Sequence, residues 1–245
     1  MHVTYAQIHS IVQGVAYVEE KEEGIHFHRF TPAEGIKDVC IHFPWSVCSV
    51  LKKLCLDDGS FVEPVKKDKK ILVFGDSITQ GFDAEHPINR YAANLADALE
   101  AEEFNKAVGG EVFCPWLAES KNNFEPDYIS VAYGTNHWLG SSPEELASAC
   151  EEFFDKLVAH YPNTSIFVFT PIWRKDCTDI TCFKSFEEIG EIIADVVKKY
   201  DYVTCFSGRN FVPEDENLFE DRYLHPNDAG FKYYTEGIKK ALKLR

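Results

Sequence analysis

A short stretch of the sequence, residues 71–81, places a serine where a nucleophile could act. Four apolar residues come first, and a turn with Asp76, Ser77 and Gly81 follows. The apolar run predicts a short buried strand, and α/β sheets bind their ligands at the carboxyl ends of their strands. A serine hydroxyl becomes a good nucleophile when a neighbouring base, most often histidine, takes its proton. Asp, Ser and Gly are also common in ordinary turns, so this interpretation of Ser77 needs partners from elsewhere in the chain.

Three further polar segments supply such partners. His225 is the candidate base, and Asp221 is the candidate carboxylate that fixes the imidazole tautomer and stabilises its protonated form. The backbone amides of Ser77 and Gly110 and the side-chain amide of Asn136 are candidate donors to an oxyanion. Each segment follows a predicted strand or leads into a predicted helix, and such loops share one edge of a parallel sheet. We therefore expect these side chains to converge.

The elements that position them lie between residues 69 and 245. Amphipathic segments predict three helices, of which one opens with a capping box at Ser142 and Glu145, one opens with Ser185, and the last follows Asn227. Strands alternate with these helices, which predicts a parallel sheet covered on both faces. The predicted strands comprise residues 71–74, about 104–108, 128–133, 165–169 and 202–206.

Residues 1–68 have a different pattern, with short β-type runs between glycine and proline turns. We expect a small antiparallel sheet or partial sandwich that packs on the main domain, because the segment is short for a complete sandwich. The lysine-rich stretch 66–70 predicts a solvated linker rather than a polyanion site, because the whole chain is acidic. The predicted strands comprise residues 8–12, 15–18 and 25–30, and a further apolar stretch spans residues 47–56.

The composition argues against several classes of protein. The chain has 245 residues, 45% of them apolar, and a net charge of −15. This size suits one full α/β domain with a smaller appendage, and the negative charge makes nucleic acids and anionic membranes poor partners. No apolar run is long enough to cross a bilayer, and residues 1–14 lack the features of a signal peptide, so we expect a cytoplasmic protein. The scattered cysteines are expected to be reduced thiols.

The four polar segments together resemble the sequence blocks of the SGNH hydrolase superfamily, the GDSL-type esterases and lipases. The resemblance covers about residues 71–245, and the correct order of four blocks makes it specific. It implies a flavodoxin-like three-layer α/β/α sandwich and the hydrolysis of esters, often acetyl esters on sugars, without a metal or other cofactor. The matching residues are Gly75, Asp76 and Ser77; Asn105, Ala107 and Gly110; Gly134 and Asn136; and His225 and Pro226.

Two positions depart from the family's pattern. The family usually has Asp three residues before the histidine, but Arg222 stands there and Asp221 lies four residues before His225. Either the loop bulges to bring Asp221 to the imidazole, or a backbone carbonyl supports the histidine instead. The second departure is His137, which stands where the family usually has Asp. We interpret it either as a substrate contact or as a structural histidine.

Trp116 and Trp138 are further candidates for lining the substrate site, and core packing is the alternative for at least one tryptophan of the chain. The resemblance implies a serine esterase that acts on a small-molecule ester. An acetyl group on a carbohydrate is the expected substrate. Two alternatives remain: a thioesterase or lysophospholipase on the same scaffold, and a carbohydrate-binding relative that has lost turnover.

Overall fold

A computed structural model of the protein describes residues 7–10, 17–22, 25–29, 39–45, 50–177 and 180–244. The chain forms two compact units, Met1–Val65 and Lys66–Arg245, with a division close to the one that we expect from the sequence after residue 68. Within the described ranges, no helix combines the length and apolar character that a bilayer crossing requires. The cysteines in these ranges are free thiols.

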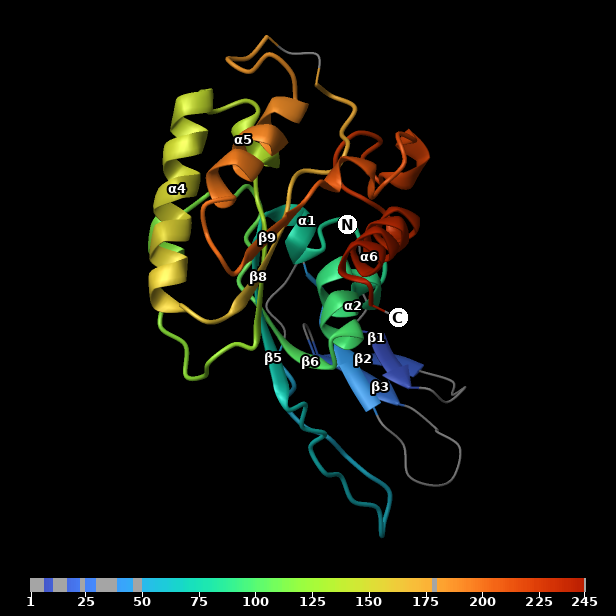
Figure 1. Ribbon diagram of the computed structural model, residues 1–245. Coiled ribbons are helices and arrows are strands. Elements are labelled where there is room, and N and C mark those ends of the chain that lie inside the picture. Colours follow the sequence, from blue (N-terminus) through green and yellow to red (C-terminus); the bar gives the residue numbers. More distant parts are fainter. Residues whose placement is uncertain are drawn as a thin grey trace. The chain divides into compact units, whose positions relative to one another are not determined.

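The N-terminal unit contains two small antiparallel sheets (Figure 1). The apolar stretch 50–56 forms no strand, and its large side chains are exposed. The remainder of that stretch, residues 47–49, and residues 11–12, 15–16 and 30 of the predicted strands lie outside the described residues. Strand β1 (Gln7–Ser10) pairs with β4 (Val39–His42), and β2 (Tyr17–Glu22) pairs with β3 (Ile25–Arg29).

The second unit is built on a five-stranded sheet in which every pairing is parallel. The spatial order is β6-β5-β7-β8-β9, so the first strand of this unit lies between its second and third strands. This is the flavodoxin-like order, and it puts the switch point of the sheet between β5 and β7. The strands are β5 (Lys69–Gly75), β6 (Ala101–Asn105), β7 (Tyr128–Ala132), β8 (Ser165–Phe169) and β9 (Val203–Phe206).

Helices cover both faces of this sheet (Figure 1). Alternate residues of β5 face the two cores: Leu72 and Phe74 join one, and Ile71 and Val73 join the other. The first core is closed by α3 (Pro115–Ala118), α4 (Pro143–His160) and α5 (Glu187–Val197), and the second by α1 (Ser77–Gln80), α2 (Tyr91–Ala98) and α6 (Asp228–Leu242). Short 3₁₀ helices are η1 (Pro87–Asn89), η2 (Thr135–His137), η3 (Gly208–Asn210) and η4 (Glu216–Leu218). The predicted three-layer α/β/α fold is confirmed.

The three predicted helices are present, and each begins within the predicted stretch. The capping box of α4 is present, and the Asn227 side chain caps α6 by accepting two backbone amides. The helix predicted to open in the stretch 185–188 is α5, which begins at Glu187 with Phe186 as its N-cap and without a side-chain cap hydrogen bond. Phe186 is buried against Trp138, so apolar packing rather than a serine cap fixes where α5 begins.

Candidate active site

Ser77 is the first residue of α1, directly after the central strand β5. Asp76 is the N-cap, and its carboxylate accepts the amide N–H of Ile78 at 3.0 Å. The amide of Ser77 itself stands in the first turn, where no acceptor exists within the helix. Ser77 is 6% exposed, so the fold holds its hydroxyl at a fixed place at the edge of the sheet.

A hydrogen-bonded chain links the hydroxyl of Ser77 to an imidazole and then to a carboxylate. Ser77 Oγ lies 2.9 Å from His225 Nε2, and His225 Nδ1 lies 2.7 Å from Asp221 Oδ2. An ionised carboxylate can only accept, so Nδ1 carries the proton and Nε2 is left as an acceptor. The Ser77 hydroxyl can therefore donate to Nε2, which is the arrangement that a general base requires.

Asp221 reaches the imidazole although it stands one position further back than the family's pattern. Arg222 adopts a left-handed φ of +70°, which takes up the extra residue of the loop. The Asp221 carboxylate also accepts the amides of Tyr223 at 3.0 Å, Leu224 at 2.8 Å and His225 at 3.1 Å. The structure thus shows the bulged loop, the first of the two arrangements that the sequence left open.

These contacts also set the charge of Asp221. Partial burial by itself would raise the pKa of its carboxyl. The amides of Leu224, Tyr223 and His225, together with the His225 imidazole, more than offset burial, so the pKa of Asp221 lies below its ordinary value. Asp221 is therefore ionised at neutral pH, as an acid that orients a histidine must be.

Asp76 has the opposite environment. It is 3% exposed, and burial raises the pKa of its carboxyl to about 7 against the opposing effects of nearby backbone amides and Arg174. Its Ile78 contact organises the turn before α1, so Asp76 positions the helix that begins with Ser77.

The expected oxyanion donors lie in two loops that are tied together. Asn136 Nδ2 donates one of its two hydrogens to Glu111 O at 2.9 Å, which leaves the second free for a ligand. The Val108–Glu111 turn is closed by a 3.1 Å bond from Glu111 N to Val108 O, and Gly110 has a φ of +80°, as a type II turn requires. The Gly110 amide has no acceptor among the described residues, so it too is available.

The three candidate substrate-lining residues differ in how far they are exposed to solvent. His137 is 2% exposed, packs against Phe113, and has a pKa lowered by burial to about 4, which makes it a neutral core residue. Trp138 is also buried and stacks near Phe183 in the core. Trp116 is 66% exposed on α3. The structural interpretation of His137 and the packing interpretation of Trp138 therefore fit better than direct substrate contact.

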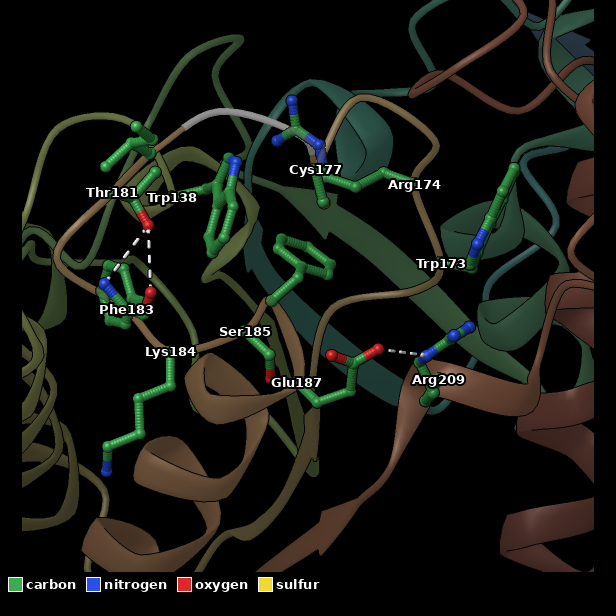
Figure 2. A pocket seen from close by; sticks show the side chains of 12 residues that line it. Trp138, Trp173, Arg174, Cys177, Thr181, Phe183, Lys184, Ser185, Glu187 and Arg209 are labelled. Carbon is green, nitrogen blue, oxygen red and sulfur yellow. Dashed lines mark hydrogen bonds and ion pairs between the residues drawn. The ribbon is translucent and has the colours of Figure 1, made fainter.

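A cavity of about 500 Å³ lies at the same carboxyl edge of the sheet (Figure 2). Trp138 and Trp173 stand on opposite sides of it in this view, and Arg209 and Glu187 form an ion pair at 3.0 Å beside it. Arg174 connects the cavity to the Asn136 loop, because its Nη1 donates to Thr135 O at 3.0 Å. Aromatic faces thus alternate with polar groups in the cavity wall.

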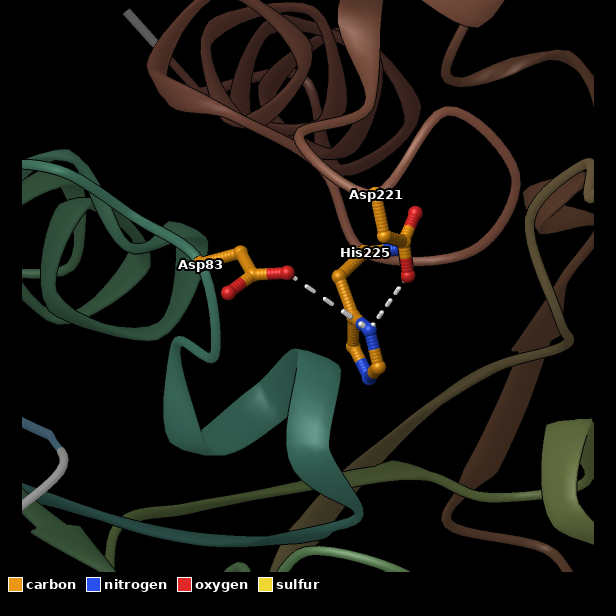
Figure 3. Close-up of side chains that lie close together, drawn as sticks. All are labelled: Asp83, Asp221 and His225. Carbon is orange, nitrogen blue, oxygen red and sulfur yellow. Dashed lines mark hydrogen bonds and ion pairs between the residues drawn. The ribbon is translucent and has the colours of Figure 1, made fainter. Parts of the chain in front are cut away.

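Two contacts of His225 were not expected from the sequence. Phe82 packs against the imidazole with ring centroids 4.7 Å apart, and Asp83 Oδ2 lies 3.8 Å from Nδ1 (Figure 3). No sequence pattern indicates either contact, because both residues follow Gly81 in a loop whose direction is set by backbone geometry. Asp83, Asp221 and His225 also offer three ligand atoms of a kind that could hold a cation.

Comparisons with known proteins address the family and the fold of the chain. Residues 73–233 match the model of the GDSL-like Lipase/Acylhydrolase family, and no curated protein matches the chain. The fold is similar to a candidate GDSL-like lipase from Bacteroides ovatus ATCC 8483, with a TM-score of 0.72, 22% identity, and 96% of this chain and 76% of that chain covered.

Two further solved structures share the fold. The salicylyl-acyltransferase SsfX3 from a tetracycline biosynthetic pathway has a TM-score of 0.78 at 18% identity, with 97% of this chain and 72% of that chain covered. A family two carbohydrate esterase from Clostridium thermocellum in complex with cellohexaose has a TM-score of 0.59 at 18% identity, with 97% and 87% covered. At these identities the likeness establishes the fold, and the family model establishes the family. The chain therefore belongs to the GDSL-like lipase/acylhydrolase family within the SGNH hydrolases and is a serine hydrolase that acts on esters.

Proposed function

We propose that this protein hydrolyses short acyl esters, with acetyl groups on a carbohydrate as its substrate class, through an acyl-enzyme on Ser77. The observation that supports this most directly is the chain of hydrogen bonds from Ser77 through His225 to Asp221, at 2.9 and 2.7 Å. These residues are far apart in sequence, so only the fold brings them into the order that nucleophilic catalysis requires.

The chemistry proceeds in two halves. Ser77 Oγ attacks the ester carbonyl carbon while its proton passes to Nε2 of His225, and the carbonyl oxygen becomes an oxyanion. The amides of Ser77 and Gly110 and the free hydrogen of Asn136 Nδ2 donate to that oxygen. The imidazolium then protonates the leaving alcohol, and the carbon–oxygen bond to it breaks. Water hydrolyses the acyl-enzyme by the same route, with His225 again as base and then acid.

The positions of two cavities support the proposal of a short acyl group. Neither the 500 Å³ cavity of Figure 2 nor a smaller one of about 10 Å³ has Ser77 or His225 in its wall. A long alkyl chain needs a deep apolar cavity beside the nucleophile. Neither of these two cavities offers a fatty acyl chain room beside Ser77, which supports the choice of an acetyl-sized group.

The carbohydrate assignment rests on the larger cavity and on the comparison. Trp173 and the polar side chains of Arg174, Glu187 and Arg209 in the cavity wall offer an aromatic face and hydrogen-bonding groups that suit a sugar ring. The Clostridium thermocellum esterase with the same fold was solved with cellohexaose. We assign the leaving alcohol, rather than the acyl group, to this cavity.

A panel of p-nitrophenyl esters with increasing acyl length, followed by acetylated oligosaccharides, tests the proposal. We expect turnover to be highest with acetate, and Ser77→Ala to abolish it. A maximum at long acyl chains would instead support a thioesterase or lysophospholipase. Equal rates for the wild type and Ser77→Ala would support a binding protein without turnover.

The salicylyl-acyltransferase with the same fold suggests one further experiment, a test for acyl transfer. Added alcohols would compete with water for the acyl-enzyme if the chain transfers acyl groups. We expect free acetate to remain the main product, and a predominant transfer product would replace hydrolysis by acyl transfer as the function of the site.

A further inference from the structure

The segment after Ser77 folds back onto the imidazole of His225. Helix α1 ends in a Schellman motif, in which Gly81 has a φ of +97° and the amide of Phe82 donates to Ser77 O at 2.8 Å. A side chain at position 81 would collide with Arg90, since its Cβ would lie 2.1 Å from Arg90 Cδ. The glycine permits the sharp turn, and the turn returns the following residues to the catalytic histidine.

Two carboxylates consequently approach the same ring nitrogen (Figure 3). Asp221 Oδ2 lies 2.7 Å from His225 Nδ1, and Asp83 Oδ2 lies 3.8 Å from it. Figure 3 shows that they come from different directions, Asp221 from the loop before α6 and Asp83 from the turn after α1. The Asp83 distance exceeds that of a hydrogen bond, so Asp83 acts on the ring through its charge.

We propose, on the basis of the function proposed above, that Asp83 is a second positioning acid for His225. Its carboxylate stabilises the imidazolium that forms when Ser77 loses its proton. It also supports the imidazolium in part when Asp221 is removed, because its charge remains 3.8 Å from Nδ1. The side chains of His225 and Asp83 are only 15% and 22% exposed, so solvent screens this attraction incompletely.

The Asp221 carboxylate makes hydrogen bonds to the loop as well as to the imidazole. Asp221 Oδ1 accepts amides of Tyr223, Leu224 and His225, so part of its negative charge stabilises the loop rather than the ring. Asp83 adds a second negative charge near the same ring nitrogen, at 3.8 Å. In this proposal, Asp221 fixes the orientation of the imidazole, and Asp83 makes the electrostatic potential at the ring more negative.

Other charges near this site face other partners. Asp76 bonds the Ile78 amide, and Glu220 in the histidine loop is exposed. Among the described residues, the carboxylates that the structure records within 4 Å of the imidazole are those of Asp83 and Asp221. The neighbouring charged side chains pair elsewhere: Arg222 with Asn217, Asp228 with His86, and Lys175 with Glu216.

Asp83→Asn tests the proposal, with Glu85→Gln as the matched control. Asparagine tolerates the left-handed φ of +67° at position 83, so the loop is preserved. Glu85 is an exposed acid two residues further on, and its carboxylate lies 4.0 Å from His86 Nδ1. Its removal takes the same charge from the same loop without touching His225.

The primary readout is the NMR titration of the His225 ring in the substrate-free protein. We expect Asp83→Asn to move its titration midpoint to lower pH by about 0.5–1 unit, and Glu85→Gln to leave it in place. The acid limb of kcat/KM should move by the same amount, because the base must be neutral to accept the proton of Ser77. A midpoint that does not move in Asp83→Asn would overturn the proposal.

A double variant separates reinforcement from a structural role. Asp83→Asn alone should lower kcat about 3- to 10-fold, and should lower the residual activity of Asp221→Asn by at least about tenfold more than it lowers that of the wild type. Effects that simply multiply would mean that Asp83 only supports the loop. A wild-type pH profile that EDTA shifts as Asp83→Asn does would mean that the three groups hold a cation, which would also overturn the proposal.

The two proposals can fail separately. The ring titration needs no substrate, so it reports on Asp83 even if no ester is turned over. Absence of Ser77-dependent turnover with a shifted midpoint would reject the esterase function alone. Normal turnover with an unshifted midpoint would reject the role of Asp83 alone.

Discussion

Two histidine–aspartate pairs lie around the start of α6, and they differ in their surroundings. His225 Nδ1 is hydrogen-bonded to Asp221, and His86 Nδ1 is hydrogen-bonded to Asp228. The side chains of the first pair are 15% and 18% exposed, whereas those of the second are 40% and 24% exposed. Residue types and the bonded ring atom are the same in both pairs, so the pairing alone does not make a catalytic group.

The difference lies in what else each member contacts. Nε2 of His225 faces the hydroxyl of Ser77, so its proton affinity can be used on a nucleophile. Asp228 accepts the backbone N–H of His86 at 3.2 Å as well as the ring N–H, so that pair fastens a loop to the first turn of α6. A histidine–carboxylate pair therefore becomes a catalytic candidate through burial and through the group at its second nitrogen.

Removal of each histidine should have the largest and most different effects on the two pairs. We expect His225→Ala to lower kcat by a factor of about 10⁴, since the base is lost, and His86→Ala to change kcat less than about threefold. Steady-state rates on p-nitrophenyl acetate, normalised to folded protein by circular dichroism, measure both. Comparable losses in two folded variants would contradict the distinction between the pairs.

The second prediction concerns Asn136, a candidate oxyanion donor, instead of a member of the His225–Asp221 pair. Asn136→Ala should lower kcat by about 10²–10³-fold with little change in KM, because the donor acts on charge that exists only in the transition state. Asn136 also donates to Glu111 O, so thermal unfolding must accompany the kinetics. A rise in KM at constant kcat would show that Asn136 holds the substrate instead.

The third prediction compares the two aspartates. Asp221→Asn should lower kcat about 10²-fold, less than the loss of about 10⁴-fold known for a serine-hydrolase triad without a supporting acid, because Asp83 remains beside the ring. Asp228→Asn, in which the amide retains one acceptor for the loop, should leave kcat within about threefold of the wild type. Wild-type turnover in Asp221→Asn would reject Asp221 as the orienting acid.

The same pairs show how far the sequence can be read. The strands at 71–74, 128–133, 165–169 and 202–206 agree with β5, β7, β8 and β9 to within two residues, because apolar runs in a covered parallel sheet are easily recognised. The strand predicted at about 104–108 begins instead at Ala101, because pairing with Lys69–Val73 of β5 overrides the polar character of Glu102 and Glu103.

Within the site, composition located the groups but could not fix their contacts. The sequence offered Asp221 or a backbone carbonyl as the partner of His225, and the left-handed turn at Arg222 is what brings Asp221 to the ring. No pattern marked Asp83, because its position depends on the Schellman turn at Gly81. His86 and Asp228 form a similar hydrogen-bonded pair, and nothing in the sequence distinguishes this structural pair from the candidate catalytic pair of His225 and Asp221.

The fourth prediction has the smallest effect and concerns stability rather than rate. The folded-state pKa of Asp221 is lowered by the loop amides and the imidazole despite partial burial, so its charge stabilises the native state. That stabilisation is complete above the unfolded pKa of about 3.9 and is lost as pH falls through the lower folded pKa. The Tm of Asp221→Asn should therefore lie below that of the wild type at pH 6, and the gap should close in strong acid. A gap that is independent of pH would mean that the amide replaces the charge fully.

For Asp76, the dependence of stability on pH has the opposite sign. Burial raises its folded-state pKa to about 7, so the native state binds its proton more tightly than the unfolded chain does. With respect to this group, wild-type stability is therefore highest below the unfolded pKa of about 3.9, falls as pH rises from there to about 7, and is level at higher pH. Asn at position 76 can still cap α1 and carries no charge to bury, so the stability of Asp76→Asn should rise relative to that of the wild type between pH 5 and pH 8.

The size of this effect makes it measurable. Each pKa unit is worth about 1.4 kcal/mol, and about 2–4 °C in Tm accompany each kcal/mol in a domain of this size, so calorimetry can detect where the two curves of Tm against pH cross. Parallel curves for Asp76→Asn and the wild type would show that solvent or a neighbouring cation compensates this carboxylate in the folded protein.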